Sequence, residues 1–545
     1  EPTDILNAEN SEILSKEVKA VIAYLNGDVE KFKNLAVEIF RYGLAPQIIL
    51  QLAAKEVNFP QDWELSAWLL FYIHEKNPND EKITQMLRGI LFSAPVLGKE
   101  EEAEHLLRRF IEIDPRPEYY RWLGGYLLAS KKYDKALKIL EEGYKRYPSD
   151  GKLGSLLSYA YFVKGNILKS FYIFRSEKSP QSDFEENVEL FALLYTPTGR
   201  ELLAEKIADL FTDNPSSLEK MLYITHLTGW DNAILTFGRA LEKALTYPQE
   251  EDIPYLTLYW LTELRKEKKL KPDEEKLINN LLEEYGDNPL LLLVKSYYET
   301  LKGNYKEALS FLKRVDDNRL APAFLPGYFA LKFYYRYNWN DKVLKSLTLR
   351  DIFKLLNYLY PLSPQQADLL AEKYLELNPQ SNSYGVVIDT FFRLGDLNLA
   401  AKYSRRAIQK FPQNPDFLNV YAYTLLLLRG KDAAPQAIEL LKKALKLSPK
   451  NGAYLDSLGW AYYLMGNFAI AEKYLKEALK IAPKDAVLNY HVGALLLGEG
   501  KPCEAVNYLK TSLKRLYTLT NEPEPGIINK VKKLLREAQK NCKTP

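Results

Sequence analysis

The sequence predicts an all-α solenoid of about 12 stacked helical hairpins, and three observations lead to this fold class. Alanine and proline recur about 34 residues apart, which is a period typical of helical-repeat arrays. Apolar residues follow helical spacing on both sides of Gly-containing turns. No motif of reactive residues accompanies the period. Proteins with these features bind other molecules more often than they transform them.

The period is clearest near the C-terminus, where two alanines and a proline repeat at offsets of 34 and then 37 residues. One copy comprises Ala471, Ala478 and Pro483. The preceding copies comprise Ala437, Ala444 and Pro449, and then Ala400, Ala407 and Pro412. Further prolines at similar intervals are interpreted as helix ends: Pro78, Pro115, Pro148, Pro180, Pro215, Pro248, Pro289, Pro322 and Pro379.

Within one repeat, small residues are expected where two helices cross. Leu458, Gly459 and Tyr462 belong to a first helix, and Gly466 with Asn467 breaks it. Ala471 then lies on the apolar face of a second helix. A larger side chain at the crossing would separate the helix axes and cost about 1–3 kcal/mol.

Composition indicates a well-packed protein and gives no electrostatic case for nucleic-acid binding. The 545 residues include 74 basic and 71 acidic side chains, for a net charge of +3. The basic run 265–271 is interpreted as a solvated helix end, because Pro272 and Asp273 follow as helix-start signals. No apolar stretch reaches the roughly 20 residues of a membrane span. Few Cys and Met with many Lys and Glu favour a thermophilic source.

The two cysteines, Cys503 and Cys542, leave two interpretations open. They are either free thiols or a disulfide that joins a C-terminal helix to the last repeat, which requires an oxidising compartment or a hyperthermophilic cytosol. Their number and spacing do not suit zinc. Because the chain begins at Glu1 without Met, a processed N-terminus with a signal peptide or lipid anchor upstream is an expectation.

No catalytic, cofactor or metal motif is found in the sequence. It lacks a phosphate-binding GxxxxGK loop, GxGxxG, HExxH and GxSxG. The four histidines are interpreted as packing or surface residues: His74, His105, His226 and His491. We therefore expect no enzyme, cofactor or metal. A remote alternative is an enzyme with its site in residues 181–285, which converging His, Asp, Glu or Cys side chains would support.

The repeats resemble the tetratricopeptide repeat, with its pattern W-x2-L-G-x2-Y, then A-x3-F, A and P. The residues that carry the resemblance are Leu458, Gly459, Tyr462, Ala471, Leu475, Ala478 and Pro483, and earlier Tyr120, Leu123, Gly124, Leu127, Ala136, Leu140, Gly143 and Pro148. The resemblance implies a right-handed superhelix with capping helices at both ends. Chaperone-binding members hold a C-terminal carboxylate with Lys and Asn at fixed repeat positions, and no repeat here has that Asn.

The spacing also predicts a division of the chain into five parts. These are a helical N-terminal cap at 1–60, an array at 61–285 that is degenerate from about 181, irregular repeats at 286–379, a regular array at 380–519, and a capping helix with tail at 520–545. An extra helix is expected at 347–360, followed by a break at 361–364. The superhelix is expected to change pitch near 320–380.

The resemblance places a partner-binding groove on the first helices of the hairpins. With the small crossing residue counted as position 8, positions 5, 9 and 12 give an aromatic ladder with polar groups: Tyr159, Phe162, Tyr297, Phe392, Asn419, Tyr423, Asp456, Trp460, Tyr463 and Tyr490. Tyrosine and tryptophan suit peptide recognition, because they bury large areas and keep a hydrogen-bonding group. The alternative interpretation is that these rings pack between adjacent helices.

A narrower resemblance concerns residues 421–425 and 456–462, which are similar to long bacterial envelope and lipoprotein-type tetratricopeptide proteins. At least one such type is an adaptor of a periplasmic processing protease. This resemblance implies a non-catalytic adaptor in the periplasm or at the outer membrane, with a protein or peptide partner. The alternative is a cytosolic co-chaperone or assembly factor. The sequence does not indicate an oligomeric state.

Overall fold

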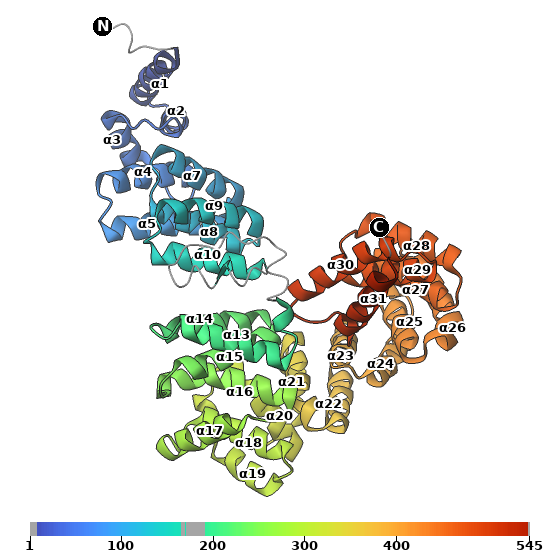
Figure 1. Ribbon diagram of the computed structural model, residues 1–545. Helices are drawn as coiled ribbons and strands as arrows, with labels where there is room; N and C mark the ends of the chain where they lie inside the picture. The colour runs from blue at the N-terminus through green and yellow to red at the C-terminus, as the bar shows by residue number, and fades with distance from the viewer. Residues whose placement is uncertain (1–7, 165–168, 171–190, 543–545) are drawn as a thin grey trace. The chain divides into compact units, whose positions relative to one another are not determined.

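The computed structural model describes residues 8–164, 169–170 and 191–542, which form α-helices joined by short turns (Figure 1). No strand occurs within these ranges. The predicted all-α solenoid class is confirmed. The chain forms two compact units, residues 1–181 and 182–545. The boundary between them lies inside segment 61–285, which the repeat spacing assigns to one array that is degenerate from about residue 181.

The first unit consists of antiparallel helices that pack on their neighbours in sequence. Their bounds are α1 (Ala8–Leu25), α2 (Val29–Arg41), α3 (Gln47–Glu56), α4 (Trp63–Lys76), α5 (Glu81–Phe92), α6 (Ala94–Leu97), α7 (Glu100–Ile113), α8 (Pro117–Ala129), α9 (Tyr133–Arg146) and α10 (Gly151–Val163). The first three helices fall in the predicted N-terminal cap.

The second unit contains two runs of helices. The first run comprises α13 (Pro197–Leu210), α14 (Pro215–Thr228), α15 (Asp231–Ala244), α16 (Ile253–Glu267), α17 (Pro272–Glu284), α18 (Pro289–Leu301), α19 (Tyr305–Arg314), α20 (Leu325–Tyr335) and α21 (Leu349–Leu362). The second comprises α22 (Pro364–Leu377), α23 (Ser381–Arg393), α24 (Leu397–Lys410), α25 (Pro415–Arg429), α26 (Ala434–Leu447), α27 (Gly452–Leu464), α28 (Phe468–Ile481), α29 (Ala486–Gly498), α30 (Pro502–Thr518) and α31 (Ile527–Asn541).

The repeated small residues lie at the helix crossings, as the sequence predicts. The alanines of the repeat are completely buried: Ala400, Ala407, Ala437, Ala444, Ala471, Ala478 and Ala505. A Cβ atom on Gly459 would lie 2.7 Å from Cγ of Leu475, which belongs to the second helix of the same hairpin. Gly124 faces Leu140 in the same way. The period therefore arises from close contact between the two helices of each hairpin.

Two adjacent glycines in α8 test this explanation. A Cβ on Gly124 would lie 2.2 Å from Cδ2 of Leu140, whereas a Cβ on Gly125 would meet no atom within 4 Å. We expect Gly124→Ala to destabilise the first unit by about 1–3 kcal/mol through overpacking. Gly125→Ala should instead stabilise it by about 0.5–1 kcal/mol, because alanine favours a helix. Urea unfolding of both variants checks the prediction, and equal effects would contradict it.

Prolines lie either just after the end of a helix or at its first position, and the sequence predicted only the first of these roles. Pro412, Pro449 and Pro483 each lie two residues beyond the end of a helix, as predicted. Pro215 and Pro289, predicted to end helices, instead begin α14 and α18. Proline is tolerated at the first helical position because the amide there has no intrahelical acceptor.

The irregular region contains the predicted extra helix. Helix α21 covers Leu349–Leu362, close to the expected 347–360, and its N-terminus is capped by the side chain of Thr348. The helix continues through Pro361 and ends at Ser363, so the break is shorter than expected. Helix α21 packs against α16, α18, α20, α22 and α23. It thereby joins the two runs of helices within the second unit.

The C-terminal helix is attached covalently and by packing. Cys503 near the start of α30 forms a disulfide with Cys542, which follows α31. Of the two interpretations that the sequence leaves open, the structure has the disulfide. Ile527, Ile528 and Val531 on α31 are buried, and the helix packs against α29 and α30 (Figure 1).

Candidate functional site on the inner helices of residues 182–545

Helices α27 and α29 bring four of the predicted groove residues together around a buried histidine. The Trp460 ring stacks on His491, with 4.0 Å between ring centroids, and on Tyr463, with 4.7 Å. The Tyr490 ring lies 5.5 Å from that of Trp460. Nδ1 of His491 is hydrogen-bonded to Oδ1 of Asp456 at 2.6 Å. These groups form one continuous cluster.

The segment between α30 and α31 reaches this cluster. The hydroxyl of Tyr423 donates to Oε2 of Glu524 at 2.8 Å and lies 3.3 Å from Nε2 of His491. Glu524 is 1% exposed. Several rings of the predicted ladder therefore pack within the chain, as the second interpretation expects. A role for them in contacting a partner stays a prediction.

A pocket of about 640 Å³ lies beside the ladder. It is lined by Phe392 of α23, Asn419 and Tyr423 of α25, Asp456 of α27, and Pro523 of the segment before α31. Four of the predicted groove residues thus share one pocket. Oδ1 of Asn419 is buried and has no hydrogen-bond donor among the described residues.

The other predicted groove residues do not join this pocket. Tyr297 is completely buried in the interior, where its hydroxyl donates to the carbonyl of Tyr358 at 2.6 Å. It does not lie on an open groove, because α21 packs against its helix. Tyr159 is half-buried on α10 in the first unit. The side chain of Phe162 lies outside the described residues.

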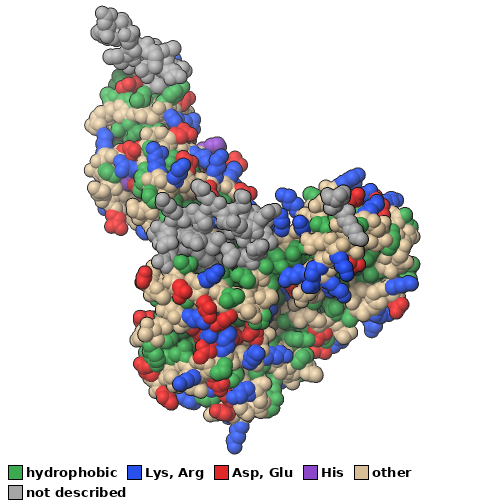
Figure 2. All heavy atoms as spheres, viewed as in Figure 1, with side chains coloured by type: hydrophobic (Ala, Val, Ile, Leu, Met, Phe, Trp, Pro, Cys, Tyr) green, Lys and Arg blue, Asp and Glu red, His purple; other side chains and the backbone are tan. Residues whose placement is uncertain are grey.

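A larger cavity of about 940 Å³ is lined by α14, α15, α16, α21, α23 and α31. We call it the basic cavity. It is lined by two acidic residues, Asp231 and Glu522, and by seven Lys and Arg residues: Arg265, Lys266, Lys268, Arg350, Lys354, Arg393 and Lys532. Figure 2 shows Lys and Arg side chains crowded over the region that Figure 1 labels α31.

A buried ion pair forms one wall of the basic cavity. The guanidinium of Arg265 donates to both carboxylate oxygens of Asp231, at 3.0 and 3.1 Å. Burial opposes ionisation of Asp231, but Arg265 and Lys266 hold its pKa below the usual range. Arg265 also lies over the Tyr358 ring, 5.4 Å from its centroid. The sequence interpretation of 265–271 as a solvated helix end is wrong for Arg265, whose side chain is 11% exposed.

Two other residues of the cavity have perturbed pKa values. Burial and then the charge of Lys354 lower the pKa of His226 to about 4, although Asp231 acts in the opposite direction. Burial and then the charge of Arg350 lower the pKa of Lys354. Burial is the larger cause of both shifts, and neighbouring positive charge adds to it. At neutral pH His226 is uncharged.

Sequence reasoning missed this cavity. Its residues His226, Arg265 and Lys354 come from three helices and share no repeat spacing. The sequence signal was limited to a basic run and an isolated histidine. Neither indicates that these residues line the same cavity.

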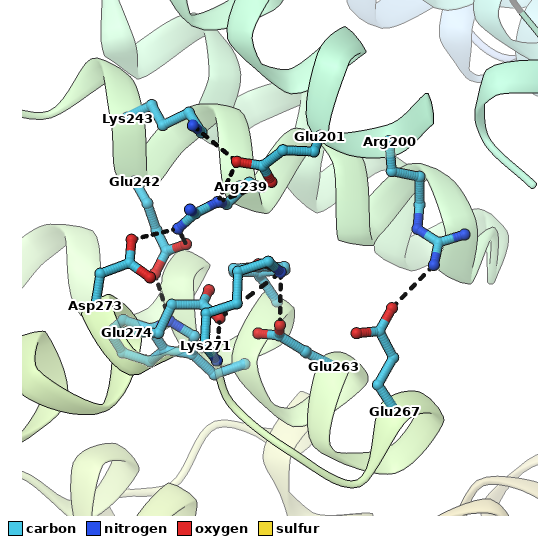
Figure 3. Close-up of polar contacts among 12 residues, drawn as sticks. Arg200, Glu201, Arg239, Glu242, Lys243, Glu263, Glu267, Lys271, Asp273 and Glu274 are labelled. Carbon is cyan, nitrogen blue, oxygen red and sulfur yellow. Dashed lines mark hydrogen bonds and ion pairs between the residues drawn. The ribbon is translucent and has the colours of Figure 1, made fainter. Parts of the chain in front are cut away.

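Residues 197–284 contain a second polar cluster, drawn in Figure 3. Arg239 of α15 bonds Glu201 of α13, Glu242 of its own helix and Asp273 of α17, at 3.1, 3.3 and 2.8 Å. Lys271 lies 2.8 Å from Glu263. The ten labelled residues include six carboxyl groups and four cations, so two bound protons would balance their charge.

Two carboxyl groups of this cluster have the properties needed to hold those protons. Burial and then hydrogen bonding to Glu274 raise the pKa of Glu263 to about 9, and the same two causes raise the pKa of Glu242 well above its usual range. Burial alone would raise the pKa of Glu274, but the bonds from Glu242 and Glu263 lower it. Glu274 is thus ionised between two neutral acids.

The convergence of Glu242, Glu263 and Glu274 is the feature that would support an enzyme at 181–285. The cluster adjoins a pocket of about 500 Å³ lined in part by Glu263 and Arg239. However, Glu263 and Glu274 are each 1% exposed, and both are bonded to Lys271. Trp260 donates to Glu242 at 2.9 Å. Each carboxyl group accepts from an internal donor, an arrangement that supports the packing of four helices, whereas Oε2 of Glu263 and Oε2 of Glu274 are buried without a hydrogen-bond partner among the described residues.

Within the described residues, no group of three or more His, Cys, Asp or Glu side chains is arranged to hold a metal ion. Among the described helices, none has both the length and the apolar character needed to cross a bilayer.

Comparisons with known proteins agree with the repeat pattern. A tetratricopeptide-repeat family model matches residues 452–485, and a second one matches residues 97–151 and 388–451. A TPR repeat-containing protein of Pseudomonas aeruginosa is 41% identical over 80 residues, which are 15% of this chain. The match spans 13% of that relative, so the chain covers far less than two thirds of its length.

Two solved structures also match this chain. A thermophilic TPR protein of Thermus thermophilus is 22% identical, with 35% of this chain and 99% of that chain covered and a TM-score of 0.28. Yeast Tom70 is 14% identical, with 85% and 96% covered and a TM-score of 0.28. At these values neither structure bears on function. The matches show that this chain contains tetratricopeptide repeats, at residues 97–151 and 388–485.

Proposed function

We propose that this chain is a non-catalytic adaptor that holds a segment of a partner protein in the basic cavity of residues 182–545. The observation that carries the proposal is the basic cavity, a space of about 940 Å³ with charged and hydrogen-bonding walls. A cavity of this size and composition can accept an extended polypeptide segment.

The family supports a binding function. Tetratricopeptide-repeat proteins are generally non-catalytic scaffolds for protein–protein interactions. In this chain the carboxyl cluster around Glu263 bonds internally, as described above.

We also propose that the adaptor works in the bacterial cell envelope. The disulfide between Cys503 and Cys542 supports this location, since disulfides persist in oxidising compartments. The bacterial relative and the similarity of residues 456–462 to envelope-type repeats agree with it. Rapid alkylation of thiols in intact source cells tests the location, and fully reduced cysteines would contradict it.

Site-specific photo-crosslinking in source cells tests the adaptor function. A benzophenone amino acid replaces Asn357, which lines the basic cavity, or Lys480, an exposed residue on the second helix of its hairpin. We expect a discrete protein adduct from position 357 and none from position 480. Adducts from position 480 alone, or none from either position, would contradict the proposal.

A further inference from the structure

The basic cavity has an excess of positive charge that the chain as a whole does not have. The chain carries a net charge of +3 over 545 residues, whereas seven Lys and Arg side chains and two acidic side chains line this one cavity. Asn232, Asn357 and Thr262 add neutral hydrogen-bonding groups. The lining therefore differs from an ordinary solvated surface with mixed charges.

The two acidic residues of the cavity are already engaged. Asp231 is bonded by Arg265 and lies 3.5 Å from Nζ of Lys266. Glu522 accepts hydrogen bonds from the backbone amides of Gly526 and Ile528, at the start of α31. Neither carboxylate is available to neutralise the remaining cations.

Two cations on α21 lack an acidic partner. Among the described residues, no carboxylate oxygen lies within 4 Å of the charged nitrogens of Arg350 or Lys354. These side chains are one helical turn apart, and their like charges repel each other. Arg350 is exposed and Lys354 is half-buried, and an anion bound between them would offset this repulsion.

Arg265 supplies a further unused donor. Its Nε is buried and has no acceptor among the described residues, although the two terminal nitrogens bond Asp231. A buried donor without an acceptor is energetically unfavourable. A bound carboxylate near Arg265 would remove this cost, and the planar guanidinium is well suited to carboxylates.

The position of these cations between helices restricts the kind of anion that fits. Nucleic-acid binding generally relies on an extended basic surface that follows the phosphate backbone, whereas these cations line a partly open cavity between helices of one unit. An extended peptide can enter such a space and present its side chains to several helices. The tetratricopeptide repeats also favour a polypeptide, rather than another polyanion, as the binding partner.

We propose that the basic cavity binds an acidic peptide, a partner segment with several Asp or Glu residues whose carboxylates pair with Arg350, Lys354 and Arg265. The proposal rests on the proposed adaptor function and specifies the chemistry of the partner. It differs from recognition of a single terminal carboxylate, because several cations from α16 and α21 line one cavity.

The test measures binding of a fluorescein-labelled 12-residue peptide with six Glu residues among Gly and Ala, by fluorescence anisotropy. The matched probe has Gln in place of every Glu. We expect the full chain to bind the Glu peptide at least about tenfold more tightly than the Gln peptide, with weaker binding at higher salt. Binding should also raise the pKa of His226, observed by NMR of the histidine rings, because added carboxylates counter the positive field.

Variants distinguish the basic cavity from other basic surfaces. The double variant Arg350→Ala/Lys354→Ala should weaken binding of the Glu peptide at least about tenfold, and its thermal melt reports whether it remains folded. The control variant Lys473→Ala/Lys480→Ala removes two exposed lysines from α28 and should bind as the unmodified chain does.

Several results would overturn the proposal. They are absence of binding up to about 1 mM peptide, equal binding of the Glu and Gln peptides, no loss in a folded Arg350→Ala/Lys354→Ala variant, or tighter binding of a 12-residue oligothymidylate. If the Glu peptide does not bind but crosslinks from position 357 still form, the proposed adaptor function stands and only the acidic class of partner is rejected.

Discussion

Glu263→Gln is expected to make the stability of residues 182–545 much less sensitive to alkaline pH. Glu263 is 1% exposed, and burial followed by its bond to Glu274 raises its pKa from 4.5 to about 9. The folded state therefore retains a proton that the unfolded chain releases. This stabilisation is complete below pH 4.5 and is lost as pH rises towards 9. Between these values the loss is about 1.4 kcal/mol per pH unit.

Gln is a suitable replacement because it remains neutral and can donate to Glu274 and accept from Lys271. Urea unfolding at several pH values from 5 to 9 measures the effect. The matched control is Glu283→Gln, an exposed residue on α17, which should leave the pH dependence unchanged. A slope in Glu263→Gln equal to that of the unmodified chain would show that the proton is not held at this residue.

Reduction of the disulfide between Cys503 and Cys542 should produce another large loss of stability. The cysteines are 39 residues apart, and closure of a loop of this length is worth about 4 kcal/mol in the chain-entropy description. We expect a lower melting temperature of α30 and α31 in the presence of reductant, together with faster proteolysis between residues 519 and 526. Differential scanning calorimetry and limited proteolysis measure the two effects.

The double variant Cys503→Ser/Cys542→Ser is the control, because it should melt at the lower temperature with or without reductant. If reductant leaves the melting temperature of the unmodified chain unchanged, packing alone holds α31. The disulfide also affects the proposed site, since Lys532 of α31 and Asn521 before it line the basic cavity. Reduction should therefore weaken binding of the acidic peptide.

The repeat architecture could be predicted because local spacing determines it. The buried alanines at 471 and 478 recur at 437 and 444 and at 400 and 407, and the contact of Gly459 with Leu475 recurs between Gly493 and Leu509, so the sequence shows the pattern several times. The prolines were harder to interpret. A proline just after a helix and a proline at its first position occur at similar intervals, and only the structure shows that Pro215 and Pro289 begin helices.

The candidate site was less predictable because it depends on contacts between distant residues. Alignment of the repeats correctly grouped Tyr423 with Trp460, but it could not show that Glu524, about 100 residues after Tyr423, would bond to its hydroxyl. The basic cavity depends on α21 packing against α16, where the repeat spacing is irregular. His226 and Lys354 therefore had no sequence signal that connected them.

Mass spectrometry of the adduct formed at position 357 tests the central claim most directly, because it identifies the partner segment inside the basic cavity. The account predicts that the benzophenone attaches to a segment of another protein that contains several Asp or Glu residues. Attachment to a basic or apolar segment would contradict the proposed chemistry of the cavity. Attachment only to residues of this chain itself would contradict its role as a partner-binding site.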